Sequence, residues 1–474
     1  MNIFKRMAGL GLALGALVSF AALADGAAGV RLPAFERFTL PNGTQVVLME
    51  KHDTPLVSLS ARIPGGSLGD PEGKEGTASL FADLIQKGAG QRDAAQFAEA
   101  VESVGGAFSA GAGVESVDLS ASFMAKDVDL MLELVSDALE RPRLTADEFA
   151  KVRSLAVQSI SAAKDSDPRG LIGEYGDAWL FHGHPYGRPV DGSESSLDGI
   201  TLDDVKRFYA GHVGGDRLIV SVVGDFKTAD MKRKLEAAFG GWRAGSAAVP
   251  IAPLPAPLQG RRVLLVDKPG ATQTYFWLGN VGASRTDPAR TAQSVVNTVF
   301  GGRFTSMLNT ELRIKSGLTY GASSSFDRAR QPASFSIQSY TQTEKTTDAI
   351  DLALATLDRL HGDGLDAATL DSSKQYLLGQ FPPTIETNGQ LAGRLTDLVF
   401  YALGPDDVDQ YAARVGAVDG SVVKATTQAS FPASGNLAIV LIGDAARIGD
   451  AVKKYGPVTK MSITDATYYP PGAK

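Results

Sequence analysis

The sequence predicts an α+β protein of two homologous lobes, each a mostly antiparallel β-sheet with helices packed on one face. Three observations support this fold class. Strand signals occur in pairs joined by short turns, the same order of signals occurs twice, and a stretch rich in Pro and Ala separates the two copies. The chain has 474 residues, too many for one ordinary core, and its 44% apolar and 21% charged residues are the balance of a globular protein.

The N-terminal segment has the pattern of a signal peptide. Lys5 and Arg6 precede a short apolar run that ends in Ala22-Leu23-Ala24, an A-x-A cleavage pattern. We therefore expect residues 1–24 to be removed and the protein to be exported into a bacterial periplasm. The alternative is an uncleaved anchor, but the run is short for a membrane span and no stop-transfer pattern follows it. No later stretch is apolar enough to cross a bilayer.

Two stretches show the same order of signals, which predicts a duplicated domain. "QVVLMEKHDTPLVSLSARIPGGSLGDPEG" begins at Gln45, and "RVLLVDKPGATQTYFWLGNVGASRTDPAR" begins at Arg262. Each reads as a strand, a charged turn, an alternating strand, a Gly-rich turn and Asp-Pro, followed by a helix over Gly76–Lys87 or Arg290–Val299. The buried-type strands "RLIVSVVGDF" and "NLAIVLIGDA" repeat later at a similar offset. Chance agreement of generic α/β patterns is the alternative.

These copies define the expected domain boundaries. The first lobe covers residues 25–244 and the second covers residues 262–474. Residues 245–261, which contain "GSAAVPIAPLPAPLQG", form a linker whose prolines favour an extended, stiff connection. Helical patterns over Asp93–Val104 and Thr145–Lys164 complete the first lobe.

Charge and cysteine content exclude several kinds of function. The net charge of −7 argues weakly against nucleic acid as a partner. The chain has no cysteine, which excludes disulfides, thiolate metal sites and cysteine catalysis.

Three motifs resemble those of the insulinase/pitrilysin-like zinc peptidases, particularly the branch of the mitochondrial processing peptidases and their bacterial relatives. They are the opening strands and first helix from "LPNGTQVVLMEKHDTP" to "GTASLFADLIQKG", the loop "HPYGRPVDGSESSLDGIT" and the segment "FGGRFTSMLNTELRIKSGLTYGASSSF". The resemblance covers nearly all of the mature chain. It implies that the two lobes form half of a clamshell that encloses peptide substrates.

Active members carry H-x-x-E-H on the first helix, where two imidazoles at i and i+4 bind zinc and the glutamate is the general base. The aligned positions here are Ser79, Ala82 and Asp83, and the third ligand position, on a later helix, is Ser159. A serine hydroxyl is a poor zinc ligand and alanine cannot act as a base. The resemblance therefore implies a degenerate zinc site and no metal bound by this chain. Asp83 alone is better explained as a helix charge paired with Lys87 at i+4.

A zinc site built from other residues was also considered. The chain has five histidines, and only two of them, His182 and His184, are close in sequence. That pair lies in a loop rich in Gly and Pro, so loop packing explains it better than a metal site. The five are His52, His182, His184, His212 and His361.

The motif of the second lobe is retained. In family members with the signature R-x6-Y, an arginine and a tyrosine face the zinc site, and the matching residues here are Arg313 and Tyr320. A guanidinium can hold peptide carbonyls, and a phenol can donate to a developing oxyanion. Without the motif, Arg313 would be an exposed helix arginine paired with a nearby acid, and Tyr320 a half-buried strand tyrosine.

The stretch "GGAFSAGAG" (Gly105–Gly113) resembles the edge strand on which relatives bind extended substrate by strand addition. Ser109 stands where the family usually has asparagine. We expect the strand to be kept as structure.

The retained pair and the lost zinc motif together suggest the non-zinc subunit of a heterodimeric periplasmic metallopeptidase. A homologous H-x-x-E-H partner would hold the zinc, and Arg313 and Tyr320 would act on peptide or unfolded polypeptide at the partner's site. This chain alone would be inactive. A catalytically inactive scaffold or peptide-binding protein without a protease partner is the alternative, and a free-standing enzyme with a rebuilt site is a third hypothesis.

Overall fold

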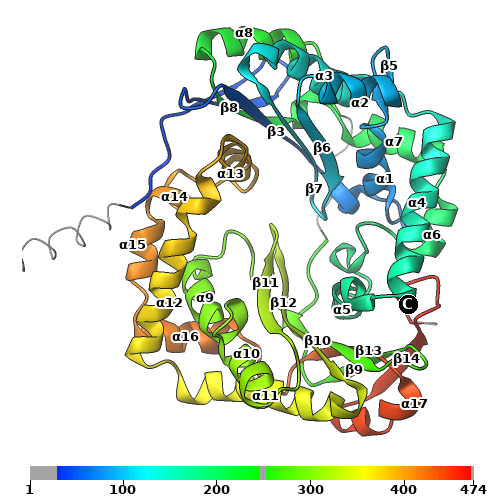
Figure 1. The fold of residues 1–474 in the computed structure, drawn as a ribbon, viewed down its shortest axis with the longest axis vertical. Helices are drawn as coiled ribbons and strands as arrows, with labels where there is room; N and C mark the ends of the chain where they lie inside the picture. Colours follow the sequence, from blue (N-terminus) through cyan, green and yellow to red (C-terminus); the bar gives the residue numbers. More distant parts are fainter. Residues whose placement is uncertain (1–28, 246–248, 250–251, 471–474) are drawn as a thin grey trace, which may run out of the picture.

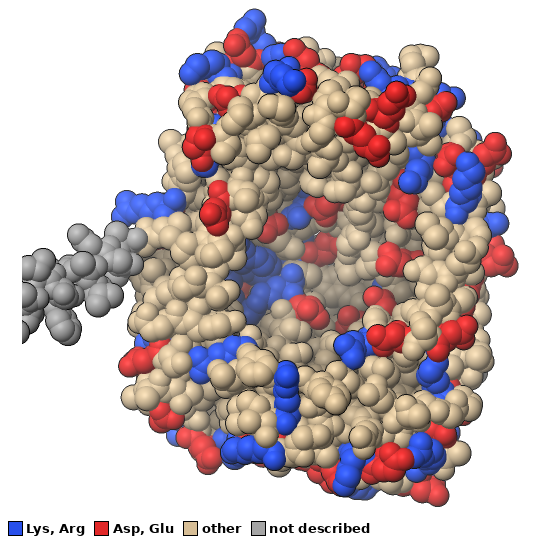
Figure 2. All heavy atoms as spheres, viewed as in Figure 1, with Lys and Arg blue, Asp and Glu red and all other residues tan. Residues whose placement is uncertain are grey.

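The computed structural model describes residues 29–245, 249 and 252–470, so the expected signal peptide, residues 1–24, lies outside the described part. Two lobes, each built on a six-stranded sheet, face each other (Figure 1). The space-filling view shows a central hollow between them (Figure 2). Among the described helices, none has the length and apolar character needed to cross a membrane.

The first sheet has the strand order β1-β2-β8-β3-β7-β6, and only the β2–β8 pair is parallel. Its strands are β1 (Glu36–Thr39), β2 (Gln45–Glu50), β3 (Leu56–Pro64), β6 (Ala107–Ala112), β7 (Ser116–Met124) and β8 (Ile219–Gly224). Strands β4 (Gly88–Ala89) and β5 (Arg92–Asp93) form a separate antiparallel pair.

The second sheet has the order β11-β12-β10-β13-β9-β14. Its strands are β9 (Arg262–Asp267), β10 (Gln273–Val281), β11 (Ala322–Arg328), β12 (Pro332–Gln342), β13 (Ala438–Gly443) and β14 (Val458–Ser462). From β2 to β6, the first sheet has the same connectivity as the second from β9 to β11, so the duplication predicted from the sequence is present in the topology. The remaining edge differs, because β1 pairs antiparallel with β2 whereas β14 pairs parallel with β9.

Helices cover both sheets, and those expected from the sequence lie within a few residues of their predicted bounds. In the first half they are α1 (Thr77–Leu84), α2 (Ala94–Glu102), α3 (Val128–Glu140), α4 (Ala146–Asp165), α5 (Ile172–Leu180), α6 (Glu194–Gly199), α7 (Leu202–His212) and α8 (Thr228–Phe239). In the second half they are α9 (Arg290–Asn297), α10 (Met307–Asn309), α11 (Thr346–Asp363), α12 (Ala367–Gln380), α13 (Asn388–Phe400), α14 (Asp406–Asp409), α15 (Tyr411–Gly416), α16 (Gly420–Ser430) and α17 (Ala445–Ile448).

The expectation that helices cover only one face of each sheet is wrong, because the two halves exchange a helix. Helix α13 packs on β3 and β8 of the first sheet, and α5 packs on β10 and β13 of the second. Both helices lie on the side of their sheet that faces the hollow (Figure 1). Because helices cover both faces of the sheet, a strand such as β2 is apolar at successive positions. In β2, Val46 and Leu48 face the outer helices, whereas Val47 and Met49 join the cluster around α13. The cores of the two halves are therefore interlocked.

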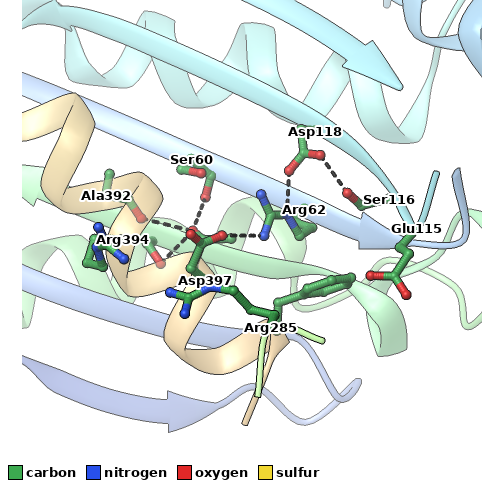
Figure 3. Close-up of polar contacts among 12 residues, drawn as sticks. Ser60, Arg62, Glu115, Ser116, Asp118, Arg285, Ala392, Arg394 and Asp397 are labelled. Carbon is green, nitrogen blue, oxygen red and sulfur yellow. Dashed lines mark hydrogen bonds and ion pairs between the residues drawn. The ribbon is translucent and has the colours of Figure 1, made fainter. Parts of the chain in front are cut away.

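An ionic network fastens α13 to the first sheet. Arg62 of β3 donates to Asp118 of β7 at 2.5 Å and to Asp397 of α13 at 2.6 Å (Figure 3). Its guanidinium also stacks on the ring of Phe400, 4.9 Å from the centroid. A second link uses buried Glu115, which accepts hydrogen bonds from the Arg330 backbone N–H.

Candidate functional site

Helix α1 holds three of the four positions that the sequence aligned with a zinc motif, and a buried carboxylate fixes its start. Asp70, from the Asp-Pro of the repeated motif, accepts the N–H groups of Gly76 and Ala78, both at 2.8 Å. Burial raises the pKa of Asp70 to about 7, while these two N–H donors act in the opposite direction. Gly76 has a φ of 100°, a left-handed conformation that glycine adopts without strain.

Three of the four aligned zinc-site positions meet in one pocket of about 500 Å³. Ser79 and Asp83 of α1 and Ser159 of α4 line it, together with Gly111 and Ala112 of the edge strand β6. Ala82, at the position of the general base, is fully buried in the core of the first lobe. The helix thus lines the pocket with Ser79 and Asp83, whereas Ala82 does not line it.

The pocket is acidic. Besides Asp83, it is lined by Glu174 of α5 and by Asp191, and its lining contains no Lys, Arg or His among the described residues. The Ser79 hydroxyl donates to Asp191 at 2.8 Å. Burial, and then the negative charge of Asp191, raise the pKa of Asp83 and raise that of Glu174 to about 7. The sequence reading identified neither Asp191 nor Glu174.

The expected pairing of Asp83 with Lys87 is not formed. Within the described chain no ion pair joins the two side chains, and Lys87 contributes only a weaker effect that lowers the pKa of Asp83. Asp83 faces the pocket and Asp191 instead.

The residues present do not fit a zinc site. Zinc needs three or four nitrogen, sulfur or oxygen ligands at close range, and no group of three His, Cys, Asp or Glu side chains in the described ranges converges closely enough to hold a metal ion. Serine hydroxyls at positions 79 and 159 do not replace imidazole and carboxylate ligands.

The two neighbouring histidines have structural contacts. His184 is buried, its Nε2 donates to the Ala252 carbonyl at 3.1 Å, and its Nδ1 accepts the N–H of Tyr186 at 3.1 Å. Both ring nitrogens are therefore used in contacts within the chain, one of them to the linker. The ring of His182 packs edge-on against Tyr469.

Arg313 and Tyr320 lie in the second lobe and do not line the acidic pocket. Arg313 is in a π-helical turn, Thr310–Lys315, and its guanidinium lies 4.7 Å from the centroid of the Phe304 ring. No described acid pairs with it, because nearby Glu311 binds Lys315 and Arg359. Tyr320 precedes β11 and is 77% exposed, and in the described part of the chain its hydroxyl has no hydrogen-bond partner.

Strand β6 forms an edge of the first sheet, as the resemblance implies for Gly105–Gly113. Ser109 is hydrogen-bonded to Ser120 of the neighbouring strand β7, with 2.8 Å between the hydroxyl oxygens. The Gln86 side chain, next to α1, donates to the Ala110 carbonyl at 3.0 Å. One edge carbonyl is thus occupied from within the chain.

Comparisons with known proteins show which family this sequence is similar to. Residues 45–193 match the family described as insulinase (peptidase family M16), and residues 199–377 match its inactive domain. A protein named uncharacterized zinc protease from Mycobacterium leprae is 27% identical over 76% of this chain and 81% of its own length. A protein named non-peptidase homolog YmxG from Helicobacter pylori is 26% identical over 72% of this chain and 78% of its own length.

Two solved structures share the fold. One is a peptidase M16 inactive domain from Pseudomonas fluorescens, with a TM-score of 0.80 and 24% identity over 87% of this chain and 98% of that chain. The other is a protease from Helicobacter pylori, with a TM-score of 0.79 and 22% identity over 87% of this chain and 100% of that chain. These two structures show the fold. Because the two family models match successive parts of the chain, residues 45–193 and 199–377, the chain belongs to the insulinase family of peptidases, M16, and is homologous to the inactive-domain proteins of that family.

Proposed function

We propose that this protein is the non-zinc subunit of a heterodimeric zinc metallopeptidase that works in the bacterial periplasm. Its partner is a homologous chain with an intact H-x-x-E-H motif, which holds the zinc. The two chains enclose a cavity in which peptides or unfolded polypeptide segments are cleaved. This chain supplies Arg313 and Tyr320 to substrate bound at the partner's metal.

One observation supports this proposal above the others. All four zinc-site positions are altered, whereas Arg313 and Tyr320 remain, and their side chains have neither an ion pair nor a hydrogen bond within the described chain. A tyrosine that is 77% exposed buries little apolar area, so its contribution to folding is small. Its retention is better explained by contact with another molecule.

The chemistry of the pair suits peptide hydrolysis. The Arg313 guanidinium has five donors in a planar arrangement and can hold the carbonyls of an extended peptide. When water bound to the partner's zinc attacks the scissile carbonyl, negative charge develops on the carbonyl oxygen. The Tyr320 hydroxyl can donate a hydrogen bond to that oxygen and stabilise the transition state.

A catalytically inactive scaffold or peptide-binding protein is the second candidate. It is favoured by the resemblance to the Helicobacter pylori protein named non-peptidase homolog. The two candidates differ in one requirement, because only a subunit of a peptidase depends on Arg313 and Tyr320 for turnover.

The test uses this chain mixed with a homologous protein that carries an intact H-x-x-E-H motif. Tyr320→Phe and Arg313→Gln should each lower the turnover of a peptide substrate by about 10- to 1,000-fold, the scale of a lost oxyanion donor. Tyr376→Phe on α12 and Arg233→Gln on α8 are matched controls, because both side chains are exposed and lie outside the motif. Unchanged turnover in both motif variants would reject the subunit role and favour the scaffold.

A further inference from the structure

Five arginines converge on a pocket of about 320 Å³ in the second half of the chain. They come from separate elements, which are the loop after β10, the start of α9, the end of β11, α13 and α15. Figure 2 shows basic side chains gathered on one side of the central hollow, near the place where α9 and the ends of β11 and β12 lie in Figure 1. The arginines are Arg285, Arg290, Arg328, Arg394 and Arg414.

One carboxylate, Asp407 of α14, serves three of these arginines. It accepts Arg290 at 2.5 Å and Arg285 at 3.1 Å, and the Arg394 guanidinium is 3.9 Å away. The Asp407 side chain is only 6% exposed. Burial alone would raise its pKa, but hydrogen bonding to Arg290 and the charges of Arg285 and Arg290 outweigh this, so the pKa is lowered. Asp407 therefore remains ionised, and its charge is already shared among these three arginines.

The other two arginines have only neutral partners. Arg328 donates to the Gln293 side-chain oxygen at 2.7 Å and to the Ser284 carbonyl at 3.3 Å. Arg414 donates to the carbonyls of Asp406 and Asp407, both at 2.6 Å. Because five guanidinium groups share one lining carboxylate, the pocket has a formal excess of four positive charges.

This excess is costly in the free protein. Burial lowers the pKa of Arg328 to about 10, and the charges of Arg285 and Arg290 act in the same direction, against the charge of nearby Asp287. An anion entering the pocket would relieve this repulsion and replace water with charge-assisted hydrogen bonds. Arg394 is the most available donor, because its charged partner in the described chain, Asp407, is 3.9 Å away and its side chain is 21% exposed.

The wall of the pocket is not only charged. Phe381 and Tyr411 stack with their ring centroids 4.1 Å apart, and Leu377 lies beside them in the lining. A free inorganic anion would gain nothing from this apolar wall. A carboxylate carried on an aliphatic side chain would place its methylene groups against it.

We propose that this arginine pocket binds the carboxylate side chains of an acidic peptide segment. This inference rests on the proposed function in one respect, which is that the peptide entering the hollow is the substrate of the peptidase. It adds a preference for substrate segments rich in Glu or Asp. Planar guanidinium groups suit this role because they bind carboxylates in a bidentate way.

The test measures binding to the full chain alone, without a partner and without hydrolysis. The probe is an acetylated, amidated peptide of alternating Glu and Ala that carries a neutral fluorophore. The matched probe has Gln in place of each Glu. We expect the acidic peptide to bind about tenfold or more tightly than the neutral one, and its affinity to fall as salt is raised.

Variants locate the site. Arg394→Gln and Arg328→Gln should each weaken binding of the acidic peptide by about tenfold, the effect of one lost charge-assisted hydrogen bond, and leave the neutral peptide unchanged. The Arg394 side chain donates no hydrogen bond within the described chain, so Arg394→Gln should fold normally even if Arg328→Gln does not. Arg233→Gln on the outer helix α8 is the control.

The outcomes separate this proposal from the subunit role. Equal binding of the acidic and neutral peptides, wild-type affinity in Arg394→Gln, or inorganic phosphate binding as tightly as the acidic peptide would overturn the acidic-peptide site. None of these results depends on Arg313, Tyr320 or a zinc partner. Conversely, failure of the turnover test would leave a positive result here intact.

Discussion

The acidic pocket beside α1 and the arginine pocket beside α9 are built on two copies of the same motif, yet they carry opposite charge. In both copies an Asp-Pro carboxylate anchors the helix. Asp70 accepts the N–H groups of Gly76 and Ala78 at the start of α1, and Asp287 accepts the Ala289 N–H at 2.7 Å just ahead of α9. The first pocket has three lining carboxylates and the second has five lining arginines. The duplicated scaffold therefore fixes where a pocket forms, and a few side chains decide what it attracts.

The largest effect is expected from removing the one carboxylate that lines the arginine pocket. Asp407→Asn leaves three neighbouring guanidinium groups without their counter-charge. We expect the free energy of unfolding to fall by about 3 kcal/mol, the cost of breaking one side of a buried ion pair. Urea unfolding measures this, and Asp358→Asn on the exposed face of α11 should be close to wild type. A loss no larger than that of the control would show that the arginines do not depend on Asp407.

The two Asp-Pro anchors allow a matched comparison. Asp70→Asn should lower the free energy of unfolding by about 2 kcal/mol, because its side chain is buried and accepts two backbone N–H groups. Asp287→Asn should lower it by about 1 kcal/mol, since Asp287 is less buried and accepts one backbone N–H and the Gln293 side chain. Denaturant unfolding at pH 8 compares the two variants. Equal losses in the free energy of unfolding would mean that the deeper burial of Asp70 does not make it the more stabilising of the two anchors.

The acidic pocket should respond to pH through Glu174. Its pKa is raised from 4.5 to about 7 by burial and then by Asp191, so the folded state holds the proton more tightly than the unfolded state does. Stability from this group is full below pH 4.5 and is lost as the pH rises to about 7. Glu174→Gln should therefore stabilise the protein by about 1 kcal/mol at pH 8 and by much less at pH 5.

Thermal unfolding at the two pH values tests this expectation. Glu236→Gln on α8 is the control, because Glu236 is exposed and should give no difference between the two values. A destabilising effect of Glu174→Gln at pH 8 would show that the ionised carboxylate has a partner in the pocket.

The smallest effect is expected at Ser79. Its hydroxyl donates to Asp191 in an exposed hydrogen bond, so Ser79→Ala should lower the free energy of unfolding by about 0.5 kcal/mol. A double variant with Asp191→Asn should show that the two losses are not additive. Additive losses would mean that Ser79 and Asp191 act independently in the pocket.

The duplication could be predicted because its signals are local. Apolar strands, turn residues and Asp-Pro are read from short windows, and their order is the same in both sheets. The exchange of α5 and α13 could not be predicted in this way. The apolar stripe of α13, with Leu391 and Leu395, shows that the helix is buried but not which sheet it covers.

The same difference between local and dispersed sequence signals applies to the two pockets. Ser79, Asp83 and Ser159 were found because they align with a motif of fixed spacing, and they do share a pocket. The arginine pocket was missed because its members are spread from residue 285 to residue 414, with no spacing that marks them. The net charge of −7 also conceals a local positive cluster.

The central claim is that this chain contributes to peptide hydrolysis without holding the metal. The most direct test measures zinc content and peptide hydrolysis for this chain alone, for the H-x-x-E-H partner alone and for their mixture. The account predicts zinc in the partner only and hydrolysis that rises when the two chains are mixed. Stoichiometric zinc in this chain alone, with hydrolysis that needs no partner, would contradict it.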